Sequence, residues 1–503
     1  MLDYRPEGMS MWDMWYLETG GVAHMLHLQN LASETQRPQG DASCLGHASS
    51  TDLIHWREHP LALCPNTPGT LDDLQPWTGC IYEHGGRFYL YYTMRASADS
   101  SMGQRIGLAL SDDLETWTRY PGNPIIEPDP RWYIGFDAPL AKGIVDARDL
   151  IIQPDPGGDG WFGFYAARIP AEEEAESAVV ATVHSRDLIH WEHLPPAFAP
   201  GKYACIEVPD VFPLGGRWYL TGLVANLYGN RGIYSDPNCT HGTIYAVADR
   251  PEGPYREIEG DNVLIGSDGT SGYSCRSLAF AGERYVFYTQ PSLAGKDTLS
   301  PPMRLVSLPD GRLRAYRSPR TEAWRQRTII APGEAPAIAK LPFQMAHWEL
   351  PAGRWRQDGA AYHGESRTGW CVADLGVGAA DMEVEARVAL KSGVAAGLVY
   401  RPDGDLSYPG GDVVFAVDAA EKCALSARTP VFNDMHKRVF PVERGREYHL
   451  RVCIRRPRFE LFIDDELVLQ FALPVDSPPH PTLALFVDRG EATITDIAAY
   501  ELG

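Results

Sequence analysis

A repeated pair of β-strands joined by a glycine turn constrains this fold more than any other feature of the sequence. The second strand of each pair is rich in aromatic residues and starts at Gly20, Gly85, Gly160, Gly215 and Gly282. Successive starts lie 65, 75, 55 and 67 residues apart. These intervals are too long for a helical solenoid and fit four-stranded propeller blades with their loops. We therefore expect a five-bladed β-propeller.

A second motif recurs in the outer half of the repeated units. It consists of a small residue, an aspartate, a turn and an aromatic residue, as in SSTDLIHWREHPLAL at 49–63, SDDLETW at 111–117, HSRDLIHW at 184–191 and, more weakly, AVADRPEGPY at 246–255. Aspartate in a turn accepts hydrogen bonds from nearby backbone N–H groups, and a recurring tryptophan suits a blade core. We interpret these residues as structural.

The chain changes character after about residue 345. Proline and arginine are frequent between 300 and 345, and short strands of alternating polarity follow, such as DMEVEARVAL and RFELFIDDELVLQFAL. Short strands separated by turn signals indicate a β-sandwich. We therefore predict an all-β protein with a five-bladed β-propeller at 1–335, a linker at 336–345 and a C-terminal β-sandwich, a lectin-like jelly roll, at 346–503.

Net charge and cysteine content limit the classes of binding partner and indicate the cellular compartment. The formal net charge of −21 argues against binding to nucleic acid or to an anionic membrane surface, since both need basic patches. The nine cysteines are odd in number, widely spaced and without a CxxC pair, so neither a disulfide framework nor a zinc site is indicated. The N-terminus carries no secretory signal, and we expect a cytoplasmic protein.

Carboxylates occur at similar distances before several of the glycine turns. The innermost strand of each blade precedes its turn, so residues at one offset should converge on the central channel. Seven residues before Gly20, Gly85 and Gly282 stand Asp13, Thr78 and Cys275, respectively. Glu207 lies eight residues before Gly215, and Asp149 lies eleven before Gly160. Like charges in a partly buried funnel raise one another's pKa. Two such carboxyl groups suit glycoside hydrolysis, in which one protonates the leaving oxygen and the other attacks the anomeric carbon or activates water.

Structural interpretations of the same residues stay open. Each acid could pair with a nearby arginine, such as Arg148 or Arg276. Trp12, Trp15 and Trp77 flank two of the inner strands, where their rings could stack on a sugar or belong to the core.

Several stretches resemble glycoside hydrolase family 32, the β-fructofuranosidases that include invertase, inulinase and levanase. The most specific is GHASSTDLIHWREHPLAL at 46–63, followed by ARD at 147–149, IEVPDVFPL at 206–214 and, near the C-terminus, RFELFIDDELVLQ at 458–470. The resemblance covers nearly the whole chain and implies the same order of a propeller and a sandwich.

The resemblance also implies roles for individual residues. Asp13 matches the catalytic nucleophile, Glu207 the general acid/base and Asp149 the carboxylate that binds furanose hydroxyls and stabilises the transition state. Arg148 would hold furanose hydroxyls or Asp149. The further positions expected to bind substrate are Trp12, Gln29, His47, Trp77 and Thr78.

The motifs depart from the family pattern around all three acids. MWDMWYLETGG lacks the asparagine before Asp13 and the proline after it, Leu150 replaces a proline, and Val208 replaces a cysteine. The retained acids suggest retained chemistry in an altered pocket.

The function expected from these features is a retaining exo-β-fructofuranosidase that forms a covalent glycosyl-enzyme, with hydrolysis or transglycosylation as the second step. The alternatives are an arabinofuranosidase or a related inverting enzyme similar to family 43, and a non-catalytic carbohydrate-binding protein. The substrate would be a small oligosaccharide or glycoside, and no cofactor or metal is implied. The C-terminal domain is expected to be structural, and a homodimer formed through it is left open.

Overall fold

The chain folds almost entirely into β-strands, which confirms the all-β prediction. Its structure, a computed structural model, describes residues 3–32, 43–99, 103–140, 143–226, 235–267, 273–290, 298–339, 353–367, 369–402, 412–428, 433–473 and 481–503. Within those ranges no helix has the length and apolar character needed to cross a membrane.

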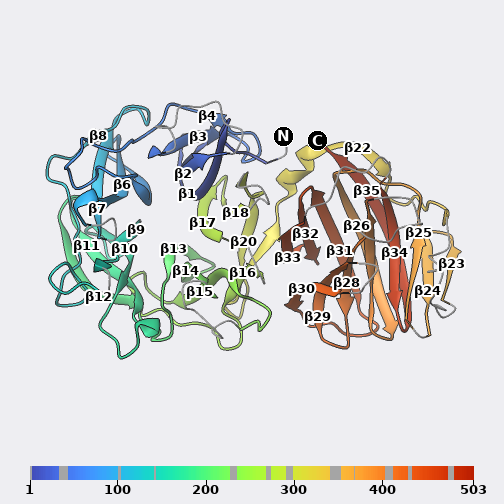
Figure 1. The fold of residues 1–503 in the computed structure, drawn as a ribbon. Helices are drawn as coiled ribbons and strands as arrows, with labels where there is room; N and C mark the ends of the chain where they lie inside the picture. Colours follow the sequence, from blue (N-terminus) through green and yellow to red (C-terminus); the bar gives the residue numbers. More distant parts are fainter. Residues whose placement is uncertain are drawn as a thin grey trace. The chain divides into compact units, whose positions relative to one another are not determined.

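Five sets of antiparallel strands form the N-terminal unit, and four of these sets are separate four-stranded sheets (Figure 1). The first two are β1 (Met9–Thr19), β2 (Val22–Leu31), β3 (Gly46–Ser50) and β4 (Arg57–Glu58), and then β5 (Trp77–His84), β6 (Arg87–Arg95), β7 (Gln104–Ser111) and β8 (Thr118–Arg119). The next two are β9 (Arg148–Pro154), β10 (Trp161–Arg168), β11 (Ala178–Ser185) and β12 (Trp191–Phe198), and then β13 (Glu207–Leu214), β14 (Arg217–Ala225), β15 (His241–Ala248) and β16 (Val263–Ser267). The fifth consists of β17 (Tyr273–Phe280), β18 (Glu283–Gln290), β20 (Met303–Ser307) and β21 (Leu313–Arg317), with β19 (Thr298–Leu299) paired to β18.

The innermost strands of these sheets close into a ring. Each of β1, β5, β9, β13 and β17 contacts the next in this order, and β17 contacts β1. The five-bladed propeller predicted from the repeats is therefore confirmed, with the first strand of every blade at the channel.

The repeated aspartate turns have one geometry in the first three blades. In the first, the Ser50 hydroxyl accepts a hydrogen bond from the Leu53 N–H at 2.8 Å, and Asp52 Oδ1 accepts one from the His55 N–H at 2.8 Å. Leu53 has a φ of 67°. The stretches 111–116 and 185–190 repeat the same bonds, so the structural interpretation of this motif is confirmed.

The C-terminal unit comprises mainly residues 321–503, and the propeller unit consists of residues 3–266 and 271–320. The division after residue 320 precedes the expected boundary at 335, because β22 (Arg325–Ile330) pairs with β35 (Glu491–Leu502) of the C-terminal unit. The predicted linker at 336–345 falls partly outside the described residues.

Two sheets enclose the core of the C-terminal unit. One contains, in spatial order, β33 (Glu466–Ala472), β32 (Arg458–Ile463), β31 (Glu447–Arg455), β26 (Met382–Ser392), β35, β24 (Ala361–Glu365) and β23 (Arg354–Asp358). The other contains β25 (Trp370–Asp374), β34 (Thr482–Asp488), β27 (Ala395–Arg401), β28 (Val413–Asp418), β29 (Cys423–Arg428) and β30 (Asn433–Val439). Apolar side chains from both sheets form one core, as predicted for a β-sandwich.

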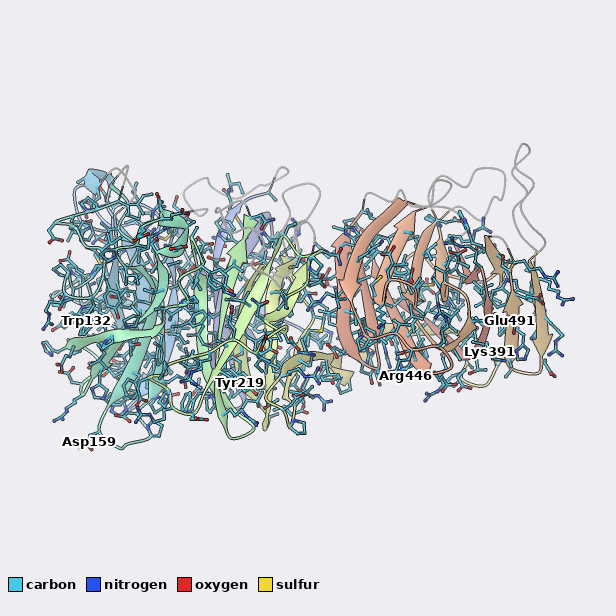
Figure 2. The ribbon with its side chains drawn as sticks, turned by 90° about the horizontal axis from the view of Figure 1, so that it is seen from below. Trp132, Asp159, Tyr219, Lys391, Arg446 and Glu491 are labelled. Atoms are coloured by element: carbon cyan, nitrogen blue, oxygen red, sulfur yellow. A yellow bond between two sulfur atoms is a disulfide. The ribbon has the colours of Figure 1, made fainter. Side chains whose placement is uncertain are left out.

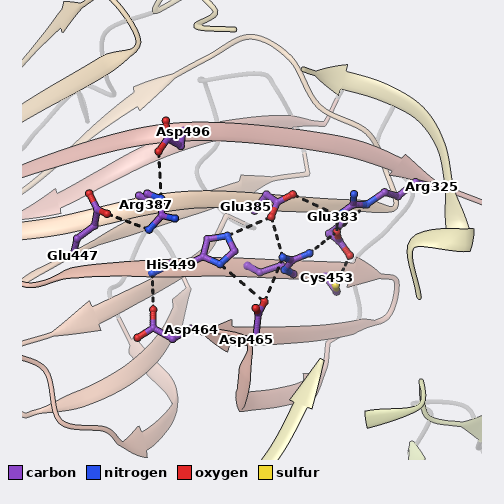
Figure 3. A network of polar contacts seen from close by, with 11 residues as sticks. Arg325, Glu383, Glu385, Arg387, Glu447, His449, Cys453, Asp464, Asp465 and Asp496 are labelled. Carbon is purple, nitrogen blue, oxygen red and sulfur yellow. Dashed lines mark hydrogen bonds and ion pairs between the residues drawn. The ribbon is translucent and has the colours of Figure 1, made fainter. Parts of the chain in front are cut away.

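Charged residues in this unit form paired networks. On β26 and β31, the buried Glu383 accepts hydrogen bonds from Arg325 and from Arg451 Nη1, the latter at 3.1 Å (Figure 3). Lys391 and Glu491, by contrast, are exposed near the ends of β26 and β35 (Figure 2). The buried Glu383 thus has two cations beside it.

The cysteines depart from the sequence-based expectation. Cys44 and Cys64 form a disulfide, and they flank an antiparallel bridge between Leu45 and Leu63. The other seven cysteines are buried and lie outside this disulfide. The expectation that no cysteines pair was wrong, because residues 20 positions apart are brought together by a bridge that composition and spacing do not reveal.

Candidate active site

Every innermost strand of the propeller breaks its hydrogen-bond register in its first half. The breaks lie at Trp12/Met14 in β1, Trp77/Gly79 in β5, opposite Phe164/Ala166 in β9, Glu207/Asp210 in β13 and Tyr273/Arg276 in β17. Four non-glycine residues there have positive φ, namely Asp13 (45°), Asp149 (64°), Val208 (47°) and Ser274 (53°). A β-bulge changes the direction in which side chains point. Non-glycine residues with positive φ are strained, and such residues cluster at functional sites.

Asp13 joins three blades through its carboxylate. Thr78 Oγ1, from β5, donates a hydrogen bond to Asp13 Oδ2 at 2.7 Å, and Ser274 Oγ, from β17, donates one to Oδ1. Burial raises the pKa of Asp13 to about 6, and the charge of Glu207 adds to the rise, whereas both hydroxyl donors oppose it. The nucleophile candidate therefore holds its proton to a higher pH than an ordinary aspartate.

Asp149 is the most enclosed of the three acids, with an exposed fraction of 3%. The Val208 N–H donates to Asp149 Oδ2 at 2.9 Å, and the Asp149 N–H donates to Thr93 Oγ1 at 3.1 Å. Burial raises the pKa of Asp149 to about 7; the charges of Asp13 and Glu207 also raise it, while Arg148 lowers it.

Arg148 links Asp149 to Glu207. Its Nε lies 3.4 Å from Asp149 Oδ2, and its Nη2 lies 3.1 Å from Glu207 Oε1. A third contact, at 2.7 Å, joins Nη1 to Asp146 Oδ1. The guanidinium is 6% exposed, whereas Glu207 is only partly buried. The arrangement leaves Glu207 as the acid with the best access to a substrate.

The predicted residues Asp13, Thr78, Arg148, Asp149 and Glu207 therefore come together. On the inner strands of four blades, Thr78 is hydrogen-bonded to Asp13, and Arg148 contacts both Asp149 and Glu207. Thr93 joins the two sets, because its Oγ1 donates to the Thr78 backbone carbonyl and accepts from the Asp149 N–H. The prediction that acids from separate repeats converge agrees with this geometry.

Three other predicted substrate-binding residues have mixed environments. Trp77 is partly buried, and the guanidinium of Arg95 lies 3.6 Å above its ring centre. Trp12 is also partly buried and packs against the core of the first two blades. Gln29 is 1% exposed, and its backbone carbonyl accepts a hydrogen bond from Gln75 at 3.3 Å. Trp15, 1% exposed, belongs to the core.

His47 lies in a cluster of histidines within the first blade. Its Nε2 is 3.1 Å from His24 Nδ1, and its ring stacks on His59 with the ring centres 4.5 Å apart. Burial lowers the pKa of His47 to about 3. These contacts do not connect it to the carboxylates, and its role in sugar binding stays a prediction.

Ser274 is the principal site residue that the sequence did not indicate. Counting back seven residues from Gly282 gives Cys275, which is buried. The bulge in β17 shifts the register by one residue, so Ser274 faces Asp13. The offset of eight that locates Glu207 before Gly215 would have located Ser274 as well.

Comparison with known proteins gives one family match. Residues 17–136 match the glycosyl hydrolases family 32 N-terminal domain, and the matched segment begins four positions after Asp13. Sucrose:sucrose 1-fructosyltransferase from Festuca arundinacea is 26% identical over 213 residues, which cover 39% of this chain and 28% of that protein. Sucrose-6-phosphate hydrolase from Zymomonas mobilis is 26% identical over 227 residues, 42% of this chain and 41% of that protein. The matched segments thus span less than half of these relatives.

Solved structures with the same architecture cover the whole chain. Sucrose-6-phosphate hydrolase from Lactobacillus gasseri superposes with a TM-score of 0.71 at 16% identity, over 100% of this chain and 93% of that one. Fructan 1-exohydrolase IIa from Cichorium intybus gives a TM-score of 0.70 at 17% identity, over 99% and 96%. These likenesses establish the fold. With the family match, they confirm the resemblance inferred from the sequence, at the low identity of a divergent relative.

Proposed function

We propose that this chain, a divergent relative of glycoside hydrolase family 32, is a glycoside hydrolase that acts on furanosides. The observation that carries the proposal is the meeting of Asp13, Asp149 and Glu207 on the bulges of three inner strands. Burying three acids around one arginine costs stability, and the cost is explained if the acids perform chemistry.

We propose a retaining mechanism for this enzyme. Glu207 donates its proton to the glycosidic oxygen while Asp13 attacks the anomeric carbon, so that the leaving alcohol departs and a covalent glycosyl-enzyme forms. Glu207, now ionised, takes a proton from water, and the resulting hydroxide displaces Asp13 from the anomeric carbon. Thr78 and Ser274 support this role because they donate hydrogen bonds to both oxygens of the Asp13 carboxylate.

Arg148 and Asp149 have supporting roles in this mechanism. Arg148 lies 3.1 Å from Glu207 and stabilises the carboxylate that exists after the first proton transfer. Asp149, held by the Val208 N–H, is placed to accept hydrogen bonds from furanose hydroxyls and to stabilise positive charge at the anomeric carbon.

Fructose-containing substrates are the first choice. The relatives and structural neighbours include proteins named for sucrose, sucrose 6-phosphate and fructan, so we propose an exo-β-fructofuranosidase that acts on small oligosaccharides. We also propose a cytoplasmic location, and a homodimer formed through the C-terminal unit.

A panel of furanosides tests the proposal. Wild-type protein is incubated with sucrose, kestose, inulin and aryl arabinofuranosides, beside Asp13→Asn and Glu207→Gln. We expect release of one sugar by the wild type and its loss in both variants. Release of sugar from arabinofuranosides alone would make arabinofuranosides, and not fructosides, the substrate class. If no substrate is hydrolysed but the protein still binds sugar, a non-catalytic binding protein is favoured.

The anomeric configuration of the first product separates the two mechanisms. Retention supports double displacement, for which the carboxyl groups of Asp13 and Glu207 should lie about 5–5.5 Å apart. Inversion, as in an enzyme similar to family 43, goes with about 6.5–9.5 Å and would overturn the covalent intermediate.

A further inference from the structure

Arg276 spans the channel of the propeller next to the three acids. It stands on β17 two residues after Ser274, and its side chain is 2% exposed. Its Nη2 donates a hydrogen bond to the Asp149 backbone carbonyl at 2.8 Å. Because β17 belongs to the fifth blade and β9 to the third, this side chain connects two blades that are not neighbours in the ring.

The remaining N–H groups of Arg276 lack the partners that buried guanidinium groups usually have. Among the described residues, its Nε and Nη1 are buried and have no hydrogen-bond partner. Arg284, on the adjacent β18, is different: its Nη1 donates to Ser277 Oγ at 2.9 Å, and its guanidinium lies over the Phe212 ring. A buried cation without an ion-pair partner destabilises the fold, so structural stability alone does not explain Arg276.

The charge balance around Arg276 supplies an explanation. Its charge lowers the pKa of Asp13 and of Cys80, which come from β1 and β5. The ionisable and charged groups that surround the channel at this level, from all five inner strands, are Asp13, Cys80, Arg148, Asp149, Glu207, Asp210 and Cys275. Four of these seven are carboxylic acids, and Arg148 is the one cation among them.

We propose that Arg276 is a positioning residue whose guanidinium is the axial counter-charge of the active site, holding Asp13 as a carboxylate and fixing the Asp149 bulge through its backbone carbonyl. The catalytic part of this inference rests on the proposed function, because an ionised Asp13 is what attacks the sugar. The electrostatic part holds for the folded protein whether or not a substrate is known.

Two variants and a matched control test the catalytic part. Arg276→Gln removes the charge, Arg276→Lys keeps it, and Arg284→Gln removes a charge from the same blade that interacts with Asp210 and not with Asp13. We expect the acid limb of kcat/KM in Arg276→Gln to move to higher pH by about 0.3 unit, with about a twofold loss near pH 6 and a smaller loss at pH 8. Arg276→Lys should keep the limb near its wild-type position, and an unmoved limb in Arg276→Gln would overturn the proposal.

Urea unfolding tests the electrostatic part without a substrate. Arg276→Gln should lose more stability at pH 8 than at pH 5, because the acids are ionised at the higher pH, and Asp13→Asn should reduce that difference. If no furanoside is hydrolysed but this pH-dependent loss of stability appears, the counter-charge role of Arg276 is supported and the proposed function is overturned. An equal loss at both pH values, as expected for Arg284→Gln, overturns the counter-charge. If Arg276→Gln alone does not fold, the double variant with Asp13→Asn is tested. Folding of the double variant supports the counter-charge, and failure to fold overturns it.

Discussion

Buried acids in the two units of this chain have opposite properties. In the β-sandwich, burial alone would raise the pKa of Glu385, but the His449 hydrogen bond and the charges of Arg451 and Arg325 lower it to about 2. In the propeller, burial raises the pKa of Asp13 to about 6 and that of Asp149 to about 7, and neighbouring acids add to the rise.

The difference lies in the number of cations beside the acids. Glu383 and Glu385 share Arg325 and Arg451, both within ion-pair distance. In the propeller Arg148 contacts Asp149 and Glu207 as well as Asp146, whereas two hydroxyl groups hold Asp13. Paired acids of the first kind hold strands together, whereas Asp13 and Asp149 retain their protons to a higher pH than ordinary aspartates.

The largest effect should come from removing the proton donor of the crowded group. Glu207→Gln keeps the shape of the side chain but cannot transfer a proton, so we expect kcat to fall by about 10²–10⁴-fold, as measured by sugar release. Azide, a small nucleophile that needs no general base, should restore part of the second step on an activated aryl substrate. A variant with near wild-type turnover would contradict the role of Glu207.

Removing a paired acid should affect stability and leave chemistry intact. Glu383→Gln leaves Glu385 as the acid that still pairs with both Arg325 and Arg451, so we expect a loss below the about 3–5 kcal/mol that breaking an isolated buried pair costs. Chemical unfolding measures the loss, and the remaining folded protein should turn over substrate at the wild-type rate. Lost activity in folded Glu383→Gln would show that the two acid groups are not independent.

Neutralising a crowded acid should stabilise the protein, in a pH-dependent way. The Asp13 carboxyl loses its proton near pH 3.8 when unfolded and near pH 6 when folded, so wild-type stability falls as pH rises between these values. Asp13→Asn avoids this loss, which corresponds to about 3 kcal/mol at pH 8. Chemical unfolding of both proteins at pH 4 and pH 8 measures the gain in stability. An equal gain at both pH values would contradict a raised pKa of Asp13.

The smallest effect should come from the hydroxyl groups that hold Asp13. Ser274→Ala removes a donor that favours the ionised form, so the pKa of Asp13 rises and the acid limb of kcat/KM moves to higher pH by about 1 unit. Thr78→Val should shift it less, because the Ser274 bond lowers that pKa more strongly. A shift in the opposite direction would mean that the limb reports another group.

The sequence predicts the blades better than it predicts the site. Five glycine turns and alternating apolar strands are local signals, and they locate the blades and the sandwich correctly. The offset count locates Asp13, Asp149 and Glu207, but it gives Cys275 where Ser274 faces the channel. A bulge inserts one residue without a clear sequence signal, so a fixed offset fails by one position.

Long-range contacts account for the other differences. The Cys44–Cys64 disulfide depends on the bridge between Leu45 and Leu63, and the early unit boundary depends on the pairing of β22 with β35. Arg276 was considered only as an ion-pair partner for an acid, whereas in the structure it bonds a backbone carbonyl. Each case joins residues through tertiary pairing that no local pattern encodes.

The location of the acids on bulged strands has a consequence for how such a protein can diversify. The intervals between successive blades vary from 55 to 75 residues, yet the inner strands β5, β9, β13 and β17 are seven or eight residues long. The variation in length among the blades therefore lies outside these inner strands, and the hydrogen-bonded ladders keep the acids in place. Connections of different length can thus be joined to one ring of acids without moving it.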